Sequence, residues 1–368
     1  MDGVGRDRPR TRSRRTRVRS PSMLQADAPP AVTASRSRLV SVDVLRGLAV
    51  ALMVLVNVPG DHGVHPSQLV HVDWEGFRLA ESVFPAFVVA SGSSLALSTR
   101  SASLTSTFAR AGRIFVVGLL LVWWKYGELG LRTGTLQFVA GSWLVAALLY
   151  RLPARWRVAA AVLLLAAVAA VHSVPSLPGR VGWGVDGIDA QVDAPLFAGR
   201  SDVGLLGMLS AGSVGLIAAV VVGAVRGSPA RRRAMVFAGA AAVAFALSAL
   251  LVAVGLPVVK RTWSPSYLAV GAALCFVVLA TSELVAATVA RRLLEPIVAL
   301  GTNALPLYVL SSAVAIVWTS ASRRSTTAWL HRMGLPEGVA SLSVSCLVLA
   351  VVLSVAWWLR RSGRVIRL

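Results

Sequence analysis

Long apolar runs alternate with short polar segments over most of this 368-residue chain. Each run is close to the roughly 20 residues that an α-helix needs to cross the hydrocarbon core of a membrane. Ten runs follow the N-terminal segment, at 40–58, 80–98, 111–126, 135–150, 156–172, 203–225, 234–256, 266–289, 297–319 and 338–359. The pattern therefore predicts an all-α fold, a polytopic transmembrane helix bundle of about ten spanning helices.

The composition changes sharply at both ends of this apolar part. Residues 1–38 hold ten arginines, many Ser, Thr and Pro residues, and few side chains that could pack in a core. Such a composition is typical of disorder. We therefore expect a disordered, Arg-rich tail at 1–38, a transmembrane domain at 39–360 and a short basic tail at 361–368.

Overall composition agrees with a membrane protein. The chain is 56% hydrophobic and only 14% charged, with a mean hydropathy of +0.70, whereas soluble proteins carry about 25% charged residues. The net charge of +21 does not indicate nucleic-acid binding, because the arginines fall between the apolar runs. Cys275 and Cys346 lie inside such runs, so they are interpreted as packing residues without a disulfide framework.

Basic residues concentrate in alternate segments between the runs. The positive-inside rule assigns these segments, together with both termini, to the cytoplasm. The loop that follows the first run then lies on the outer side. We expect an integral membrane protein, and the Arg-, Ala- and Val-rich composition favours a bacterial plasma membrane.

The first run carries polar side chains on one helix face. Asp43, Arg46 and Asn57 share this face by their spacing. Ionisable groups cost about 2.5–3.5 kcal/mol each at the centre of a membrane helix, so their presence favours a function. Asp43 and Arg46 are i,i+3 neighbours that can pair. Two roles are open: the ion pair serves only to hold the helices of the bundle together, or Arg46 binds an anionic ligand through its rigid fork of donors.

Three of the five histidines lie in the next loop, at His62, His65 and His71. They could be ordinary solvated residues. A zinc site would use the same residue types, but the H-x2-H-x5-H spacing fits no usual pattern, so no metal is expected. An imidazole with a pKa near 6.5 suits proton transfer at neutral pH. We therefore favour the hypothesis that one of these histidines is a general base.

Several motifs together resemble one known family. They are V-S-V-D-V-L-R-G, V-N-x-P-G, L-V-H-V-D-W-E-G and S-V-F-P-A-F, followed by segments at 131–140, 200–207, 256–267 and 301–311. In this order they resemble the heparan-alpha-glucosaminide N-acetyltransferase family of membrane acyltransferases. The resemblance covers about residues 39–311.

This resemblance implies a set of functional residues. The family moves an acetyl group from cytoplasmic acetyl-CoA to an amino sugar on the far side of the membrane. Its histidine in H-x-x-W-x-G and its upstream asparagine correspond to His71 and Asn57. The remaining candidates are Arg46, Asp43, Gln137 and Lys260 for the acetyl-CoA donor, and Trp74, Asp73 and Asn303 for the acceptor. Trp74 could stack on a sugar or anchor at the interface, and Lys260 could line the pocket or only reach toward the membrane surface.

The sequence also departs from the family pattern. Glu81 stands where an Asp usually precedes V-F-P, and Phe138 and Val139 replace an Arg-Ile pair. We expect acetyl-CoA as co-substrate and an amino sugar or envelope glycan as acceptor. Membrane lipid is the expected surrounding partner. Direct transfer and an acetyl-histidine intermediate both stay open, as does a homodimer.

Two other functions remain open from the sequence. A transporter or flippase of a small anionic or sugar-linked substrate would use Asp43 and Arg46 as part of a substrate path. A scaffold would use the Arg-rich tail to bind anionic lipid or nucleic acid. A transporter would move its substrate unmodified, and acetyl-CoA would have no effect. A scaffold would lose its function when residues 1–38 are deleted.

Overall fold

The computed structural model describes residues 39–98, 103–127, 134–173, 204–288 and 291–366, with positions 1 and 3. The predicted tail at 1–38 lies outside these ranges apart from those two positions, and so do residues 367–368 of the predicted C-terminal tail. Residues from Arg38 onward form one unit.

Helices account for almost all regular structure in the described part. They are α1 (Val40–Asn57), η1 (Ser67–Leu69), η2 (Leu79–Ser82), α2 (Val83–Leu97), α3 (Leu104–Tyr126), α4 (Thr135–Leu149), α5 (Ala154–Ser173), α7 (Leu205–Ala224), α8 (Ala230–Ala253), α9 (Pro265–Thr288), α10 (Arg291–Thr302), α11 (Ala304–Val317), α12 (Ser320–Arg332) and α13 (Glu337–Arg361). The described residues contain no strand, only one isolated antiparallel bridge between Glu75 and Val259. The predicted all-α class is confirmed.

Each of the ten predicted apolar runs contains a helix. In the described ranges, eight helices are long and apolar enough to cross a membrane, or nine if the bent pair of α10 and α11 counts as one span. The fourth run forms α4, which is apolar but has only 15 residues. The protein is therefore an integral membrane helix bundle, with α4 as its short member.

The apolar run predicted at 297–319 is divided between two helices. The chain bends by 82° between α10 and α11, and Asn303 between them has a non-helical backbone (φ −121°, ψ 38°). The Asn303 amide donates to the Arg364 carbonyl (3.3 Å) and accepts from the Ile366 N–H (2.9 Å). The polar side chain thus holds the C-terminal segment at the break, a contact that hydrophobic periodicity does not encode.

Helix α12 was not predicted, because its sequence contains polar residues rather than an apolar run. Its first turn is capped by Thr319, whose hydroxyl accepts from the Ser322 N–H (3.3 Å). Arg323, on the next turn, is buried. Its guanidinium donates to the carbonyls of Pro59 (2.9 Å), Ala315 (3.0 Å) and Trp318. α12 therefore joins the end of α11 to the segment after α1.

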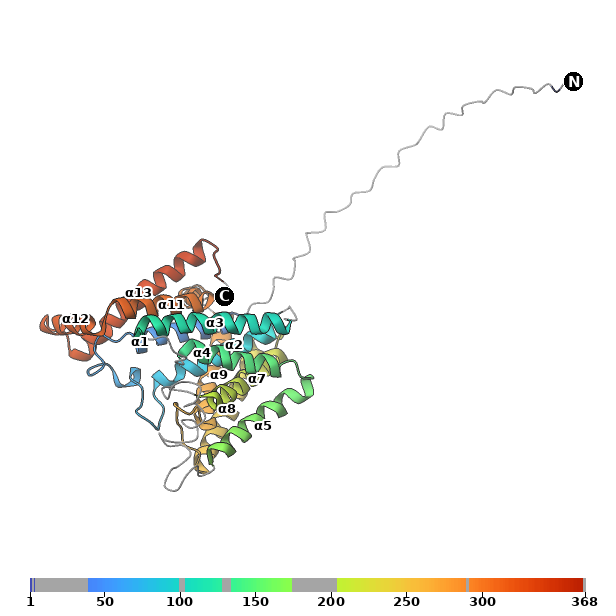
Figure 1. Ribbon diagram of the computed structural model, residues 1–368, viewed down its shortest axis with the longest axis horizontal. Coiled ribbons are helices and arrows are strands. Elements are labelled where there is room, and N and C mark those ends of the chain that lie inside the picture. The colour runs from blue at the N-terminus through green and yellow to red at the C-terminus, as the bar shows by residue number, and fades with distance from the viewer. Residues whose placement is uncertain are drawn as a thin grey trace. The chain divides into compact units, whose positions relative to one another are not determined.

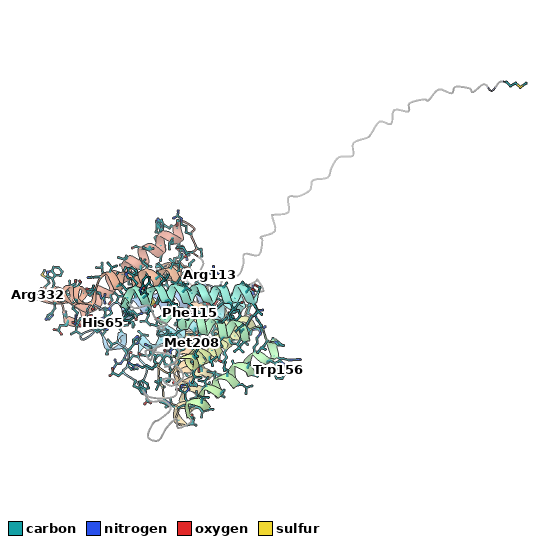
Figure 2. All side chains as sticks on the ribbon, in the orientation of Figure 1. His65, Arg113, Phe115, Trp156, Met208 and Arg332 are labelled. Carbon is teal, nitrogen blue, oxygen red and sulfur yellow. The ribbon has the colours of Figure 1, made fainter. Side chains whose placement is uncertain are left out.

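Two apolar clusters form the core of the bundle. One is built from α1, α2, α4, α7, α8 and α9, and the other from α1, η2, the start of α2, α10, α11 and α13. Figure 1 shows α5 and the α12–α13 pair at opposite edges of the bundle. Figure 2 likewise shows Trp156, on α5, at the edge away from His65. Since α1 and α2 contribute to both clusters, these two helices and the loop between them lie where the clusters meet.

Glycines allow α1 and α10 to touch backbone to backbone. A Cβ on Gly47 would collide with the carbonyl oxygen of Ile297, and a Cβ on Gly301 would collide with that of Asp43. Such small residues are common where membrane helices approach closely. The Gly that follows Arg46 in the first motif is thus explained by packing.

We expect Gly47→Ala to destabilise the protein by about 1–3 kcal/mol, because the added methyl meets backbone atoms that cannot rotate away. The measurement is thermal unfolding in mild detergent. Gly239→Ala on α8 is the matched control, because a Cβ there has no neighbour within 4 Å. It should leave stability unchanged or raise it. Equal melting midpoints for the two variants would contradict the close α1–α10 contact.

A buried carboxylate ties three helices together near the start of α1. Glu283 on α9 accepts from the hydroxyl of Ser41 (2.5 Å) and from the Nη2 of Arg233 on α8 (2.6 Å). Glu283 was not predicted as a functional or structural residue, although an acid within an apolar run is the signal that points to it. This contact fixes the end of the bundle that also contains Asp43 and Arg46.

Candidate functional site

The loop between α1 and α2 lies against the segment that precedes α9. The Gly76 N–H donates to the Val258 carbonyl (2.9 Å), and Glu75 pairs with Val259. Gly76 has φ +122°, in the region that favours glycine over residues with a Cβ. The glycine of H-x-x-W-x-G is therefore required by the turn that brings these two loops together.

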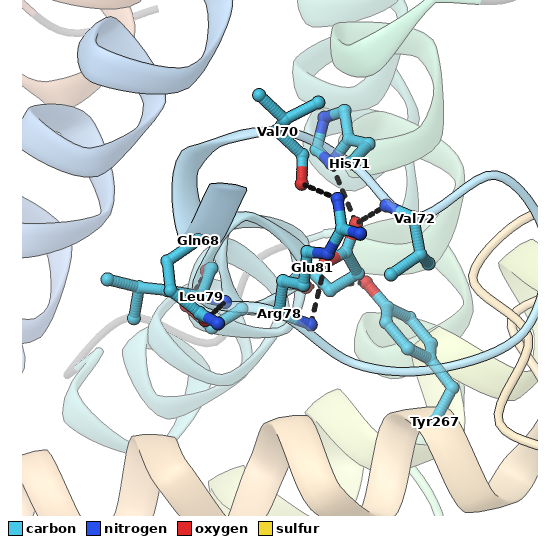
Figure 3. Close-up of polar contacts among 9 residues, drawn as sticks. Gln68, Val70, His71, Val72, Arg78, Leu79, Glu81 and Tyr267 are labelled. Atoms are coloured by element: carbon cyan, nitrogen blue, oxygen red, sulfur yellow. Dashed lines mark hydrogen bonds and ion pairs between the residues drawn. The ribbon is translucent and has the colours of Figure 1, made fainter. Parts of the chain in front are cut away.

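His71 is bound to a buried carboxylate (Figure 3). Its Nδ1 lies 2.9 Å from Oε1 of Glu81. The His71 side chain is 37% exposed, whereas Glu81 is completely buried. Since a carboxylate accepts hydrogen bonds, Nδ1 carries the proton and Nε2 of the neutral ring keeps its lone pair. None of the described residues bonds to Nε2, so the arrangement presents a proton acceptor toward the open side of the loop.

Backbone N–H groups also donate to the Glu81 carboxylate. Its Oε1 also accepts from the Val72 N–H (3.1 Å), and its Oε2 accepts from the Arg78 N–H (2.8 Å). The Glu81 carbonyl accepts from the Tyr267 hydroxyl (2.7 Å). In Figure 3, Tyr267 reaches Glu81 from α9. In the sequence Glu81 is recognisable only as a departure from the family pattern, and it was not predicted as the partner of His71.

Asn57 is the last residue of α1 and is exposed. The carbonyls around it are occupied by other side chains: Leu55 accepts from His65 Nε2 (3.1 Å), Val58 from Ser345 (2.9 Å) and Pro59 from Arg323 (2.9 Å). The Asn57 amide itself bonds to none of the described residues. A fixed backbone thus presents an amide that is open to a ligand, without a direct contact to His71.

His65 and His62 do not share the environment of His71. His65 is buried between Leu55 and Ser341, whose hydroxyl lies 2.9 Å from its Nδ1. Burial lowers the pKa of His65 below its ordinary value of 6.5. His62 is exposed. Of the three loop histidines, only His71 combines an accessible ring with a carboxylate partner.

We expect His65 to make the stability of the protein pH-dependent. The unfolded chain takes up a proton near pH 6.5 that folded His65 resists, so stability is present above about pH 6.5 and is lost as pH falls through the lower folded pKa. Melting midpoints between about pH 7.5 and 5 should fall less in His65→Gln than in the wild type. His331→Gln, at an exposed position of α12, is the control for removal of an imidazole. An unchanged pH dependence in His65→Gln would contradict this role.

Aromatic and basic side chains surround the His71 loop. The guanidinium of Arg261 lies 5.7 Å from the centre of the Trp74 ring, and Lys260 Nζ lies 5.4 Å from that of Phe84. Trp74 is partly exposed and Asp73 is exposed. Trp74, Asp73 and Lys260 therefore lie on the two loops that meet at Gly76, together with His71.

The polar pair on α1 lies toward the other end of the helix. Arg46 forms the expected ion pair with Asp43 (2.6 Å) and also donates to the Ser94 hydroxyl on α2 (2.6 Å). Asp43 and Asn57 are about 21 Å apart along the α1 axis. The predicted site residues thus form two groups rather than one.

Two further candidates have local structural partners. Gln137 is buried, and its Oε1 accepts from the Gly134 N–H (3.1 Å) at the start of α4. Asn303 is buried against the C-terminal segment, as described above. In the described ranges, no group of three or more His, Cys, Asp or Glu residues is arranged to hold a metal ion.

These features define a class: an integral membrane helix bundle with a histidine–carboxylate pair in a loop between its first two long helices. Residues 38–183 match the family model "Heparan-alpha-glucosaminide N-acetyltransferase, catalytic". Over 81 residues the chain is 42% identical to the heparan-alpha-glucosaminide N-acetyltransferase of Homo sapiens, a segment covering 21% of this chain and 12% of the human protein. The resemblance to this family is thereby confirmed for the part of the chain that carries His71 and Glu81.

Proposed function

We propose that this protein is a membrane acyltransferase that moves an acetyl group from cytoplasmic acetyl-CoA to an amino sugar or envelope glycan on the outer face. The observation that carries the proposal is the 2.9 Å hydrogen bond between His71 Nδ1 and buried Glu81. The match of residues 38–183 to an N-acetyltransferase catalytic model supports the choice of reaction.

The chemistry follows from this pair. Nε2 of neutral His71 removes a proton from the acceptor amine or hydroxyl as its nitrogen or oxygen attacks the thioester carbonyl. The new C–N or C–O bond forms, the C–S bond breaks, and the proton passes from His71 to the leaving thiolate. Glu81 stabilises the imidazolium that exists in between. Asn57 donates to the developing oxyanion, a contribution of about 2.7–4 kcal/mol for such donors.

The donor enters from the end of the bundle that contains Arg46. Arg46, Arg110 and Arg113 supply positive charge for the phosphates of acetyl-CoA, with Asp43 and Ser94 orienting the Arg46 guanidinium. Gln137 and Lys260 are assigned to the same co-substrate. Lys260, which lies next to the His71 loop, would contact its acyl end.

The acceptor binds at the His71 loop. Trp74 offers an aromatic face of the kind that sugar rings contact, and exposed Asp73 can accept hydrogen bonds from an amine or hydroxyl. Asn303 was predicted for this role, but it contacts the C-terminal segment near the Asp43 end of α1 and is not part of this surface. An amino sugar supplies both a nucleophile and an apolar ring face, so it fits this surface.

Transport is the second candidate function. The break between α10 and α11 favours it, since discontinuous helices form binding sites in many transporters. A transporter would move its substrate unmodified and would release no CoA thiol.

The test is transfer of labelled acetyl in proteoliposomes that hold the purified protein. Acetyl-CoA is supplied on one side and glucosamine on the other. We expect labelled acetyl on the sugar and one free thiol for each acetyl group transferred. Movement of unmodified sugar without thiol release would support transport instead. Mass analysis of envelope glycans from cells with and without the protein would then identify the natural acceptor.

A further inference from the structure

Four buried side-chain atoms have no hydrogen-bond partner among the described residues: Ser142 Oγ, Trp143 Nε1, Ser210 Oγ and Trp263 Nε1. Buried polar groups are normally paired, so each such atom calls for an explanation. Most other buried or partly buried helical serines have a partner: some donate to a carbonyl three or four residues earlier, as do Ser91, Ser93, Ser94, Ser213, Ser282 and Ser311, and others donate to a group outside their own helix, as do Ser41, Ser248 and Ser345. Ser142 and Ser210 do not follow this rule.

Trp263 has the most constrained environment of the four. It is completely buried and has φ +49°, which is unfavourable for a residue with a large side chain. Ser264 holds this conformation, because its hydroxyl accepts from the Val259 N–H (3.1 Å) and donates to the Pro257 carbonyl (2.7 Å). These hydrogen bonds of Ser264 thus maintain the strained backbone of Trp263, while the indole N–H of Trp263 has no partner among the described residues. Strain of this kind is concentrated at functional sites.

The Trp263 ring lies close to the proposed reaction centre. It packs against Phe84 at 5.5 Å and Phe138 at 5.8 Å between ring centres. Phe84 follows Glu81 by three residues, and the Trp263 loop pairs with the His71 loop through Val259 and Glu75. Trp263 therefore lies on the segment that pairs with the His71 loop, and its ring contacts the helix that follows Glu81.

Ser142 lies on the same face of α4 as Phe138. Residues four apart on a helix are stacked along one face, about 6 Å along the axis. Ser142 is 2% exposed. One turn of α4 thus separates Ser142 from the residue that contacts Trp263, and α4 runs from there away from the His71 end.

We propose that Trp263 Nε1–H and Ser142 Oγ–H bind the acylated arm of the donor inside the bundle. The inference rests on the proposed function. Trp263 donates to the thioester carbonyl oxygen, and Ser142 donates to the first amide carbonyl of the pantetheine arm.

The two hydrogen bonds act at different points of the reaction. The thioester oxygen gains negative charge as the acceptor attacks and loses it when the C–S bond breaks, so the Trp263 bond is strongest in the transition state. The amide oxygen does not change its charge, so the Ser142 bond contributes to donor binding. Because Trp263 Nε1 and Ser142 Oγ are buried, water does not compete with the thioester and amide oxygens for these two donors.

The experiment uses four variants of the full chain. Trp263→Phe and Ser142→Ala each remove one proposed donor. Trp143→Phe and Ser210→Ala remove the other two unpaired donors and are matched controls for side-chain volume. Acetyl-CoA binding by calorimetry, initial transfer rates and melting midpoints are measured for all of them.

We expect Trp263→Phe to lower kcat by about 100-fold, with no shift of the pH profile. Ser142→Ala should weaken acetyl-CoA binding by about three- to tenfold while its melting midpoint stays the same or rises, because an unpaired hydroxyl is removed. Both controls should bind and transfer like the wild type.

Wild-type binding and turnover in Trp263→Phe and Ser142→Ala would overturn this inference and leave the proposed function intact. The inference would also be overturned if Trp263→Phe and Trp143→Phe lost the same amount of activity and the same amount of stability, because both indoles would then have only a structural role. If the wild-type protein bound no acetyl-CoA, both the proposed function and this inference would be refuted.

Discussion

Replacing His71 with alanine is expected to reduce acetyl transfer by about 10²- to 10⁴-fold, the usual contribution of a positioned general base. The loss should fall on kcat, since the imidazole acts on the acceptor proton rather than on the phosphates of the donor. The measurement is the initial rate of labelled transfer at saturating acetyl-CoA, together with the amount of folded protein in the membrane.

The chain offers a control in the same loop. His62 is exposed and has no carboxylate at hydrogen-bond distance among the described residues. His62→Ala should therefore transfer acetyl at the wild-type rate. If His71→Ala were as active as His62→Ala, the assignment of His71 as the base would be refuted.

A second large effect is expected from Glu81→Gln. Glu81 accepts hydrogen bonds from His71 Nδ1, Val72 N and Arg78 N with its two oxygens. A glutamine has one acceptor oxygen, so its NH₂ group must face at least one of these donors. The imidazole then loses the partner that selects its tautomer and stabilises its charged form, and kcat should fall by about 10²- to 10⁴-fold.

Acetyl-CoA binding separates this effect from misfolding. Glu81→Gln should bind acetyl-CoA as the wild type does, because the carboxylate lies at the opposite end of α1 from Arg46. Glu81→Asp keeps the charge and should retain part of the activity. Full activity in Glu81→Gln would show that the carboxylate is dispensable and that His71 works alone.

The helical architecture could be predicted because lipid imposes one rule on every span. Backbone groups must be satisfied within the segment, so a long apolar run becomes a helix. That rule accounts for the ten helical runs, but it does not apply to α12, which is polar. It also gave no sign of the 82° break at Asn303, because an asparagine amide that binds a distant backbone looks like any other polar residue in the sequence.

The site could be predicted only where one segment contains the signal. His71, Trp74 and Gly76 belong to a single motif, and Asp43 and Arg46 pair across one helical turn. Partners from distant segments were missed. Ser341 lies 276 residues from His65, and Glu283 lies 242 residues from Ser41. A single sequence holds no spatial information of this kind, so residues that act through such contacts become visible only in the structure.

The anchors of the loop between α1 and α2 have a consequence for biosynthesis. His71 and Glu81 both lie within residues 38–183, yet the backbone beside them is fastened by Val258, Tyr267, Arg323, Ser341 and Ser345. During translation His71 and Glu81 are synthesised early, whereas the residues that bind the backbone beside them are synthesised later. A nascent chain halted before α13 would therefore contain every motif residue but lack the hydrogen bonds of Ser341 and Ser345 to the loop between α1 and α2.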